Sequence, residues 1–324
     1  MKYLVTGAAG YIGSVCVELL LDAGHDVFAI DDLRQGNRSA IESDATFYKA
    51  SLGDRTVLDK VFSQGIDAVF HLAAEISVPQ SMADPGLYYE TNVNQGLCLL
   101  EAMRAAGCKC LIFSSTAAVF GEPATTPIDE SHPKVPCNPY GDSKLSFERL
   151  LNWYHVCFGF RVHIFRYFNA AGATERHGED RSIEEHLIPL AFAAIKGQRE
   201  RLTVFGDDYP TSDGTCVRDY LHVRDIGQAH LQAAAYLGQN ADFDDFNLGS
   251  SSGTTVLTVL KTIERVTGYS VPYVIGERRA GDPAALVASS EKAVRKLGIR
   301  FDYSHIDYII ESAWKWFRQT ERGR

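Results

Sequence analysis

The sequence of 324 residues has no excess of basic residues and no long hydrophobic run. It contains 32 Lys and Arg against 41 Asp and Glu, which gives a formal net charge of -9. Nucleic-acid-binding proteins carry the opposite balance, so the charge argues against that class. A membrane-spanning helix needs roughly 18 apolar residues, whereas one of the longest apolar stretches runs only from Leu187 to Ile195. Because the first residues lead straight into a strand pattern, we also expect no signal peptide.

The sequence also lacks a disulfide framework. Its seven cysteines are scattered, and the closest pair, Cys108 and Cys110, is spaced C-x-C. Zinc sites and disulfide-rich domains use other spacings, such as C-x-x-C. We therefore expect reduced cysteines, no metal site and a cytoplasmic location.

What is present over the first half is an alternation of strand and helix patterns. Strands are expected at 3–6, 26–30, 45–49, 68–72, 110–114 and 162–165, and helices at 13–23, 85–106 and 140–158. This order predicts an α/β fold with a Rossmann-type doubly wound parallel sheet.

The second half is irregular and predicts a smaller α+β lobe that closes over the carboxyl edge of the sheet. Its clearest helices are expected at 187–196, 256–267 and 305–317. Since a single core stops growing near ~250–300 residues, we place one domain at 1–168 and the lobe at 169–324. Parts of 219–248 are allowed to return to the first domain.

A glycine-rich turn follows the first predicted strand. Glycines stand at 7, 10 and 13, in the spacing G-x-x-G-x-x-G, where a helix begins. They permit a tight turn and the close approach of a pyrophosphate to the helix N-terminus. A glycine turn by itself is also found where it serves only the packing of helix on strand. Here, however, Asp31 lies 18 residues past Gly13 at the end of the second strand. A carboxylate there accepts hydrogen bonds from the adenine ribose and repels a 2'-phosphate, so the combination predicts NAD rather than NADP.

Tyr140 and Lys144 lie four residues apart at the start of a predicted helix and can share one face. A tyrosine ionises near 10, so a general base at pH 7 needs a drop of about three pKa units. A neighbouring ammonium and a positive nicotinamide ring could supply it. The alternative reading of this spacing is a solvated helix face.

Hydroxyl side chains end the fifth predicted strand in the run from Ser114 to Gly121. Ligands of open α/β sheets bind at this edge. A hydroxyl there can hydrogen-bond a substrate oxygen and relay its proton to Tyr140. The alternative is a strand terminus whose hydroxyls satisfy its own backbone.

Together these motifs resemble the extended short-chain dehydrogenase/reductase superfamily. Further segments narrow the resemblance to the UDP-galactose 4-epimerases, from Met1 to about Trp316. They are residues 166–173, 186–189, 205–211, 213–215, 217–223 and 278–283.

The resemblance implies a role for each matching position. Thr116, Tyr140 and Lys144 would be catalytic. NAD would contact Gly7, Gly10, Tyr11, Ile12, Gly13, Asp31, Asp32, Leu33, Gly36, Leu52, Leu72, Ala73, Ala74, Thr91, Ser114, Tyr140, Lys144 and Phe168. The UDP-sugar would contact Thr116, Tyr140, Asn169, His186, Leu187, Thr203, Val204, Phe205, Arg218, Arg279, Asp282 and Leu286.

The implied reaction interconverts UDP-galactose and UDP-glucose. The Tyr140 phenolate takes the proton of the sugar 4-hydroxyl while NAD takes the hydride of carbon 4. The 4-keto sugar then turns over and the hydride returns to its other face. Arginine forks bind phosphate in fixed geometry, so Arg218 and Arg279 would grip the nucleotide and leave the hexose loose. Ordinary surface salt bridging is the alternative for either arginine.

Several positions depart from the pattern of these epimerases. Ser51 stands where many relatives have an aspartate, and Ile76 where some have a lysine. Glu75 is expected to face solvent. His186 replaces an asparagine and could be structural.

Two other functions compete with epimerisation. A dehydratase or decarboxylase of the superfamily needs an acid after the threonine, whereas Ala117 and Ala118 follow Thr116. A non-catalytic NAD-binding protein would normally lose the Tyr140 and Lys144 pair.

The resemblance also bears on assembly and substrate range. We expect a homodimer through the helices at 85–106 and 140–158. Leu99, Leu100, Leu150, Trp153 and Tyr154 either form its seam or face the sheet. Leu286 stands where some relatives have a bulky tyrosine, which leaves room for UDP-N-acetylhexosamines.

Overall fold

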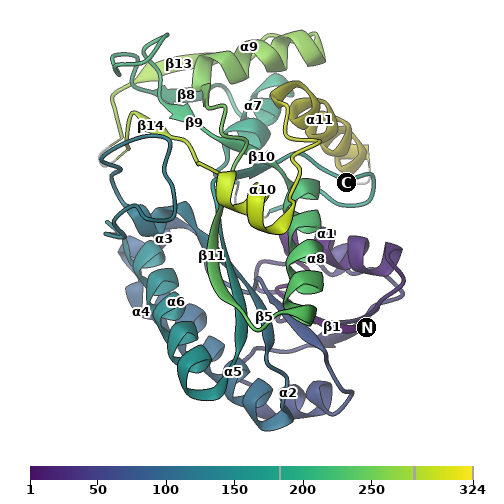
Figure 1. Cartoon of the computed structure of the whole chain (residues 1–324). Helices are drawn as coiled ribbons and strands as arrows, with labels where there is room; N and C mark the ends of the chain where they lie inside the picture. Colours follow the sequence, from purple (N-terminus) through teal and green to yellow (C-terminus); the bar gives the residue numbers. More distant parts are fainter. Residues whose placement is uncertain (182–183, 280–281, 323–324) are drawn as a thin grey trace.

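The computed structural model describes residues 1–181, 184–279 and 282–322. Its centre is a sheet of seven parallel strands in the order β11-β6-β5-β4-β1-β2-β3 (Figure 1). These are β1 (Lys2–Thr6), β2 (Asp26–Asp31), β3 (Thr46–Lys49), β4 (Ala68–His71), β5 (Cys110–Thr116), β6 (Arg161–Tyr167) and β11 (Phe243–Leu248). The order reverses between β1 and β4, which is the point where doubly wound sheets bind ligands. The predicted fold class is confirmed.

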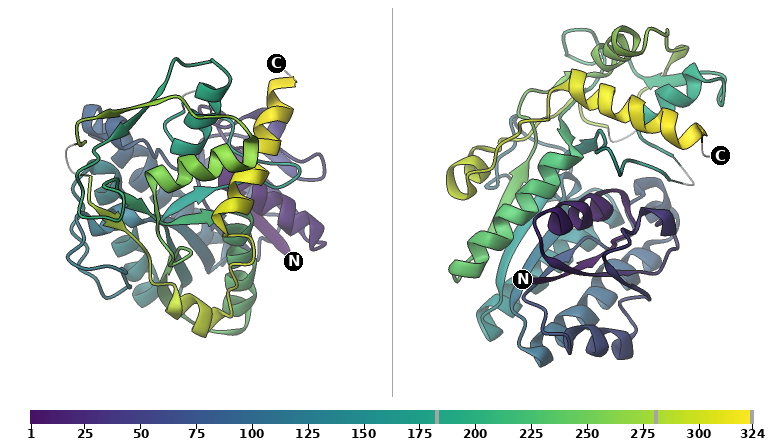
Figure 2. Two further views of the ribbon diagram at one scale, coloured as in Figure 1. Left: turned by 90° about the horizontal axis from the view of Figure 1, so that it is seen from above. Right: turned by 90° about the vertical axis from the view of Figure 1, so that its right-hand side faces the viewer.

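Helices cover both faces of this sheet, because alternate residues of each strand are apolar on both sides. One face packs on α1 (Tyr11–Asp22) and α8 (Val223–Gln239), with Val5 and Phe70 among the strand residues of that core. The other face packs on α2 (Arg55–Phe62), α5 (Gln95–Ala106) and α6 (Pro139–Phe158), with Leu4 and Phe113 in its core. In Figure 1, α1 and α8 lie on one side of the sheet and α6 on the other, and the right-hand view of Figure 2 looks onto the layer of α1 and α8.

The second half builds a smaller lobe over the carboxyl edge of the sheet (Figure 1). It holds short strands and three helices around a third apolar core. Its helices are α7 (Leu187–Ile195), α9 (Val256–Thr267) and α11 (Ile306–Arg322). Its strands are β7 (Asn169–Ala171), β8 (Leu202–Phe205), β9 (Val217–Arg218), β10 (Tyr220–His222), β12 (Thr254–Thr255), β13 (Tyr273–Gly276) and β14 (Ala285–Leu286). α10 (Glu291–Leu297) packs back on β11 and α8.

The sequence did not predict β11 as a strand, although the chain was allowed to return to the sheet there. Its register with β6 is parallel and runs from Phe243 opposite Val162 to Leu248 opposite Tyr167. The adjacent acids Asp244 and Asp245 interrupt the apolar pattern of this strand. Both are paired, with Lys292 and Lys296 of α10 among their partners, so burial of the strand does not leave charges uncompensated.

The predicted single helix over 85–106 is instead interrupted. It consists of α4 (Pro85–Tyr89), a π turn at Glu90–Asn94, and α5, and is preceded by the short helix α3 (Val78–Ala83). The π turn buries Thr91 and Asn92. Such turns are frequent at functional sites, and this one points two polar side chains into the protein.

Among the helices of the described residues, none is long and apolar enough to cross a membrane.

Candidate active site

A cleft of about 470 Å³ opens at the carboxyl ends of the central strands, under the lobe. It brings together most of the predicted residues. These are Gly7, Gly10, Tyr11, Ile12, Gly13, Asp31, Asp32, Gly36, Leu52, Leu72, Ala73, Ala74, Thr91, Ser114, Thr116, Tyr140, Lys144, Phe168, Asn169 and His186. They come from segments far apart in the chain, so the sheet edge is what assembles the site.

The glycine turn between β1 and α1 forms a cradle that side chains would fill. A Cβ on Gly7 would lie 2.6 Å from the Ala73 nitrogen, and one on Gly13 would lie 2.0 Å from the Gly7 carbonyl oxygen. Gly7 also has a φ of +69°, which favours glycine. At Gly10, the N-cap of α1, no side chain caps the helix and no acidic residue stands in its first turn. The uncapped amides and helix dipole fit a pyrophosphate.

The side chain of Asp31 is held at the cleft wall by backbone amides. Its carboxylate accepts from Ala9 N at 3.0 Å and from Leu33 N at 2.8 Å. Burial raises the pKa of Asp31, and these two hydrogen bonds act in the opposite direction. Each carboxylate oxygen keeps a second lone pair for a ribose hydroxyl. Leu33 holds a φ of 61° beside it and does not line the cleft.

Thr91 supplies a further sign that the cleft fits a polar ligand. Its buried Oγ1 has no hydrogen-bond partner within the described part of the chain and faces the cleft lining. Buried polar atoms are normally satisfied, so a ligand hydroxyl or phosphate would complete this group.

The start of α6 sets Tyr140 opposite the end of β5. Asn138 caps the helix by accepting from Gly141 N at 2.9 Å. Gly141 lets the helix approach closely, since a Cβ there would lie 2.5 Å from the Ala118 carbonyl oxygen. Burial raises the pKa of Tyr140, whereas the Thr116 hydroxyl and the Arg181 guanidinium act to lower it.

The predicted drop in the Tyr140 pKa is therefore not produced by the chain's own groups. Lys144 points its ammonium elsewhere: its Nζ donates to the Ser114 carbonyl oxygen at 2.8 Å and lies 4.9 Å from the Phe113 ring centre. Burial lowers the pKa of Lys144 to about 7, with Glu148 acting in the opposite direction. A further positive charge at the phenol, such as a cationic nicotinamide, is what this site needs to favour the phenolate.

The expectation that Glu75 faces solvent is wrong. Glu75 is 3% exposed and lines the cleft. Its carboxylate pairs with Arg34 Nη1 at 3.2 Å and accepts a hydrogen bond from Gln35. Asn92 of the π turn holds its backbone, accepting from Glu75 N at 2.8 Å and donating to Glu75 O at 3.0 Å. The sequence signal for this position was that Glu75 follows β4 closely. Its partners Arg34 and Gln35 lie about 40 residues earlier in the chain, so no local pattern connects them to it.

Eight of the predicted substrate-binding residues, all in the lobe, lie outside the cleft lining. They are Leu187, Thr203, Val204, Phe205, Arg218, Arg279, Asp282 and Leu286. Within this group Arg218 donates to Asp282 Oδ1 at 2.9 Å and to Pro283 O at 3.0 Å. The Arg279 guanidinium lies 4.3 Å from the Phe205 ring centre. Ala280 and Gly281 of the same motif lie outside the described residues.

His186 caps the entry to α7 and lines the cleft. Its Nδ1 lies 2.6 Å from Glu179 Oε1 and 3.3 Å from Glu184 Oε1. Although burial acts in the opposite direction, these carboxylates raise the pKa of His186 to about 9. Ser51, the other departure from the family pattern, also lines the cleft, and its hydroxyl donates to Gln95 Oε1 at 2.9 Å.

Comparison with known proteins agrees with this geometry. Residues 3–249 match the model of the NAD dependent epimerase/dehydratase family. The chain belongs to this family. The family prediction, and the NAD dependence that it carries, are confirmed.

Individual members of the family resemble the chain over its full length. A UDP-glucose 4-epimerase of Lacticaseibacillus casei is 46% identical, covering 100% of this chain and 98% of that protein. The solved UDP-glucose 4-epimerase of Brucella ovis, in complex with NAD, is 40% identical with a TM-score of 0.95, covering 98% of each chain. The UDP-Glc/GlcNAc 4-epimerase of Campylobacter jejuni is 38% identical with a TM-score of 0.86, covering 98% of this chain and 99% of that one.

The cradle predicts a specific effect of one added methyl group. We expect Gly13→Ala to weaken NAD binding by at least about tenfold, roughly 1.4 kcal/mol, because its Cβ would meet the Gly7 carbonyl oxygen at 2.0 Å. The measurement is the NAD released per chain from the purified protein after denaturation. Gly238→Ala in α8 is the matched control, since no atom lies within 4 Å of its Cβ. Unchanged NAD content in Gly13→Ala would contradict this assignment of the cradle.

Proposed function

We propose that this chain interconverts UDP-galactose and UDP-glucose, with NAD held as a tightly bound cofactor. The observation that carries the proposal is the convergence of Thr116, Tyr140 and Lys144 on the cleft that also contains the glycine cradle. The names of the relatives from L. casei and B. ovis support the same activity. The seven unpaired cysteines support a cytoplasmic location.

The cleft residues divide into a cofactor part and a reacting part. The α1 amides would hold the pyrophosphate, Asp31 a ribose, and Thr91 and Lys144 further cofactor hydroxyls. When bound, NAD supplies a reversible acceptor for the hydride of sugar carbon 4. We also propose that the sheet domain, 1–168 with the returning strand β11, carries this part, and that the lobe carries the UDP.

Tyr140 would move the proton of the sugar 4-hydroxyl, with the Thr116 hydroxyl between or beside the two oxygens. The proton leaves the substrate oxygen as the carbonyl forms and returns to it when the opposite face is reduced. Tyr140 is half-buried in the cleft lining, where a bound sugar would cover its phenol oxygen. Such a group contributes about 10²–10⁴-fold to the rate of a proton transfer.

Arg218, Arg279 and Asp282 would hold the UDP at a distance from the reacting sugar. The sheet register places Leu286 of β14 opposite Arg218 of β9. The residue that we propose below to limit the size of the sugar therefore lies beside a residue proposed to hold the UDP. A firm hold on the diphosphate with few polar contacts to the hexose would allow the 4-keto sugar to rotate.

Tyr140→Phe tests the proposal directly. We expect the variant to fold and retain NAD, since only the phenol oxygen is lost, while kcat falls by about 10²–10⁴-fold. Turnover is measured by following UDP-glucose formed from UDP-galactose. Tyr269→Phe, at an exposed tyrosine of the lobe, should retain wild-type turnover. Near-normal kcat in Tyr140→Phe would mean that Tyr140 is not the base.

A second proposal concerns substrate range. Leu286 packs with Phe168 against the cluster of Val119, Phe120, Ile128 and Leu145, and Phe168 lines the cleft. Leucine leaves more room there than tyrosine, and the C. jejuni relative is named for both UDP-Glc and UDP-GlcNAc. We therefore propose that the UDP-N-acetylhexosamine pair is also accepted.

The gate is tested by comparing Leu286→Tyr with Leu286→Met on both substrate pairs. We expect the tyrosine to lower kcat/KM for the N-acetylated pair by about tenfold or more relative to the simple hexoses. The methionine, of similar volume, should affect both pairs alike. No N-acetyl activity in the wild type, or an equal effect of tyrosine on both pairs, would refute the gate.

A third proposal is a homodimer through α5 and α6. Of the residues expected at its seam, Leu99, Leu100 and Tyr154 are buried in the core, and Leu150 packs against it. Trp153, in contrast, is 62% exposed. Further exposed apolar side chains on the same helices are Leu97, Val156 and Phe158. Such a group of exposed apolar residues is typical of an interface.

The dimer is tested by light scattering at micromolar concentration. We expect about twice the chain mass of 35.8 kDa for the wild type. Trp153→Glu should move the protein to a single-chain mass, because a charge would be buried without a partner. Tyr269→Glu, exposed on the lobe, should leave the dimer intact. A monomeric wild type would end this proposal.

A further inference from the structure

Glu148 lies directly behind the catalytic residues but does not line the cleft. Tyr140, Lys144 and Glu148 follow one another at intervals of four residues on α6, so they share one helix face. Glu148 is 6% exposed. A buried carboxylate is costly unless it is hydrogen-bonded and paired, so its partners indicate what it does.

The carboxylate of Glu148 joins three elements of the fold. It accepts from the Ser115 hydroxyl of β5 at 2.5 Å. It also accepts from Arg166 of β6, from Nε at 2.9 Å and from Nη2 at 2.7 Å. Ser115 immediately precedes Thr116, so one carboxylate connects the strand that carries the catalytic hydroxyl to the helix that carries the phenol.

Glu148 also provides the negative charge that opposes the effect of burial on Lys144. Lys144 is 2% exposed, and the hydrogen-bond acceptor of its ammonium is the neutral Ser114 carbonyl oxygen. The charge of Glu148 favours its protonated form. His71 of β4 does not compete for the proton, because burial and the Lys144 charge lower the pKa of His71 to about 3.

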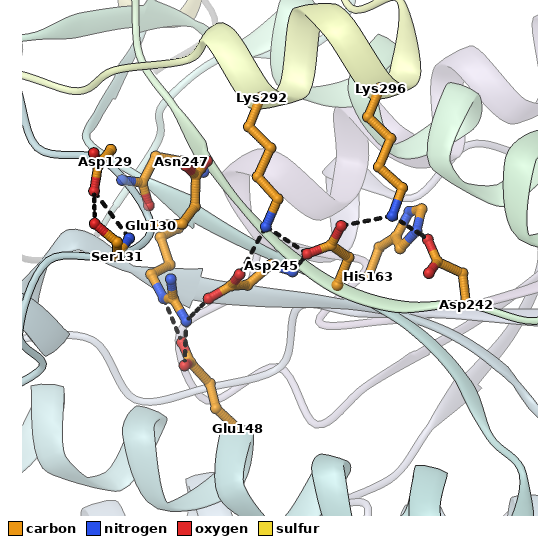
Figure 3. A network of polar contacts seen from close by, with 12 residues as sticks. Asp129, Glu130, Ser131, Glu148, His163, Asp242, Asp245, Asn247, Lys292 and Lys296 are labelled. Atoms are coloured by element: carbon orange, nitrogen blue, oxygen red, sulfur yellow. Dashed lines mark hydrogen bonds and ion pairs between the residues drawn. The ribbon is translucent and has the colours of Figure 1, made fainter.

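Arg166 fixes the orientation of Glu148. Arg166 is 1% exposed, and its guanidinium holds the carboxylate through two parallel hydrogen bonds. Its Nη2 also lies 2.6 Å from Asp245 Oδ2 of β11. Figure 3 shows that this contact continues into a chain of ion pairs with Lys292 and Lys296 of α10.

We propose that Glu148 is a positioning residue for the reaction: it sets Thr116 against Tyr140 through Ser115 and maintains the charge of Lys144, while Arg166 orients its carboxylate. The inference rests on the proposed function. It assigns to one buried pair both the geometry and the charge of the catalytic residues.

Titratable groups from several elements surround the Glu148–Arg166 pair. Tyr140 and Lys144 stand on α6, His71 on β4, Arg166 on β6 and Asp245 on β11. Lys134, in the segment before α6, senses the negative charges of Glu148 and Asp245. Among these groups, Lys144 is the cationic residue that lines the cleft, and the charge of Glu148 favours its protonated form.

The pH profile of kcat in Glu148→Gln tests the charge. The amide keeps the shape of the side chain but removes the anion, so Lys144 should lose its proton at lower pH. We expect the alkaline limb of kcat to move down by about one pH unit, with KM for UDP-galactose within twofold of wild type. Glu148→Asp, which keeps the anion, should restore the position of the limb even where kcat remains reduced.

Asp244→Asn is the control for a purely structural role. Asp244 belongs to the far end of the same ion-pair network, where it accepts from Lys296 at 2.6 Å. It should lower the thermal midpoint without moving the pH profile. If Glu148→Gln behaves in the same way, with an unchanged alkaline limb, the positioning role is refuted.

Ser115→Ala decides the matter if Glu148→Gln does not fold. It removes only the hydroxyl that joins Glu148 to β5, so kcat should fall while KM, thermal midpoint and alkaline limb stay near wild type. Wild-type kcat in Ser115→Ala would overturn the proposal. Wild-type turnover of UDP-galactose is measured first in all cases: its absence would refute the proposed function, whereas an active wild type with unresponsive variants would refute only the role of Glu148.

Discussion

The buried ammonium of Lys144 is the constraint on which the rest of the site depends. A charge held in a dry environment must be compensated, and an isolated lysine there would lose its proton. The protein surrounds it with the Ser114 carbonyl oxygen, the Phe113 ring and the carboxylate of Glu148. These partners belong to β5 and α6. The packing of α6 on β5 therefore also determines the charge state of Lys144 in the cleft.

That same packing places the two groups that we propose to handle the proton, Tyr140 and Thr116. α6 can begin close to the end of β5 because residue 141 is glycine, and Thr116 ends β5 just where the chain turns into a short 3-10 helix at Ala117–Phe120. The parallel sheet then brings the glycine cradle of α1 to the same edge. The lobe contributes a separate arginine and aspartate group above it. A cofactor bound by the sheet and a nucleotide bound by the lobe would meet at Tyr140.

The sequence predicted the parts of this arrangement that are encoded locally. The glycine turn, Asp31 and the Tyr140–Lys144 spacing each depend on residues close together in the chain, and the structure brings them to one cleft. β11 escaped prediction because Asp244 and Asp245 interrupt its apolar pattern and their compensating lysines lie on α10. Glu75 was misjudged for the same reason, since Arg34 and Gln35 are supplied by another loop. The π turn at Glu90–Asn94 and the joining of Glu148 to Ser115 likewise depend on contacts that no local pattern records.

The most direct test of the central claim follows the hydrogen on sugar carbon 4. The purified protein is incubated, without added NAD, with UDP-galactose deuterated at carbon 4, and the UDP-glucose formed is analysed by mass spectrometry and proton NMR. The account predicts product that retains the deuterium at carbon 4, because the hydride leaves and returns within one closed site. Loss of the label to solvent, or no UDP-glucose at all, would contradict it.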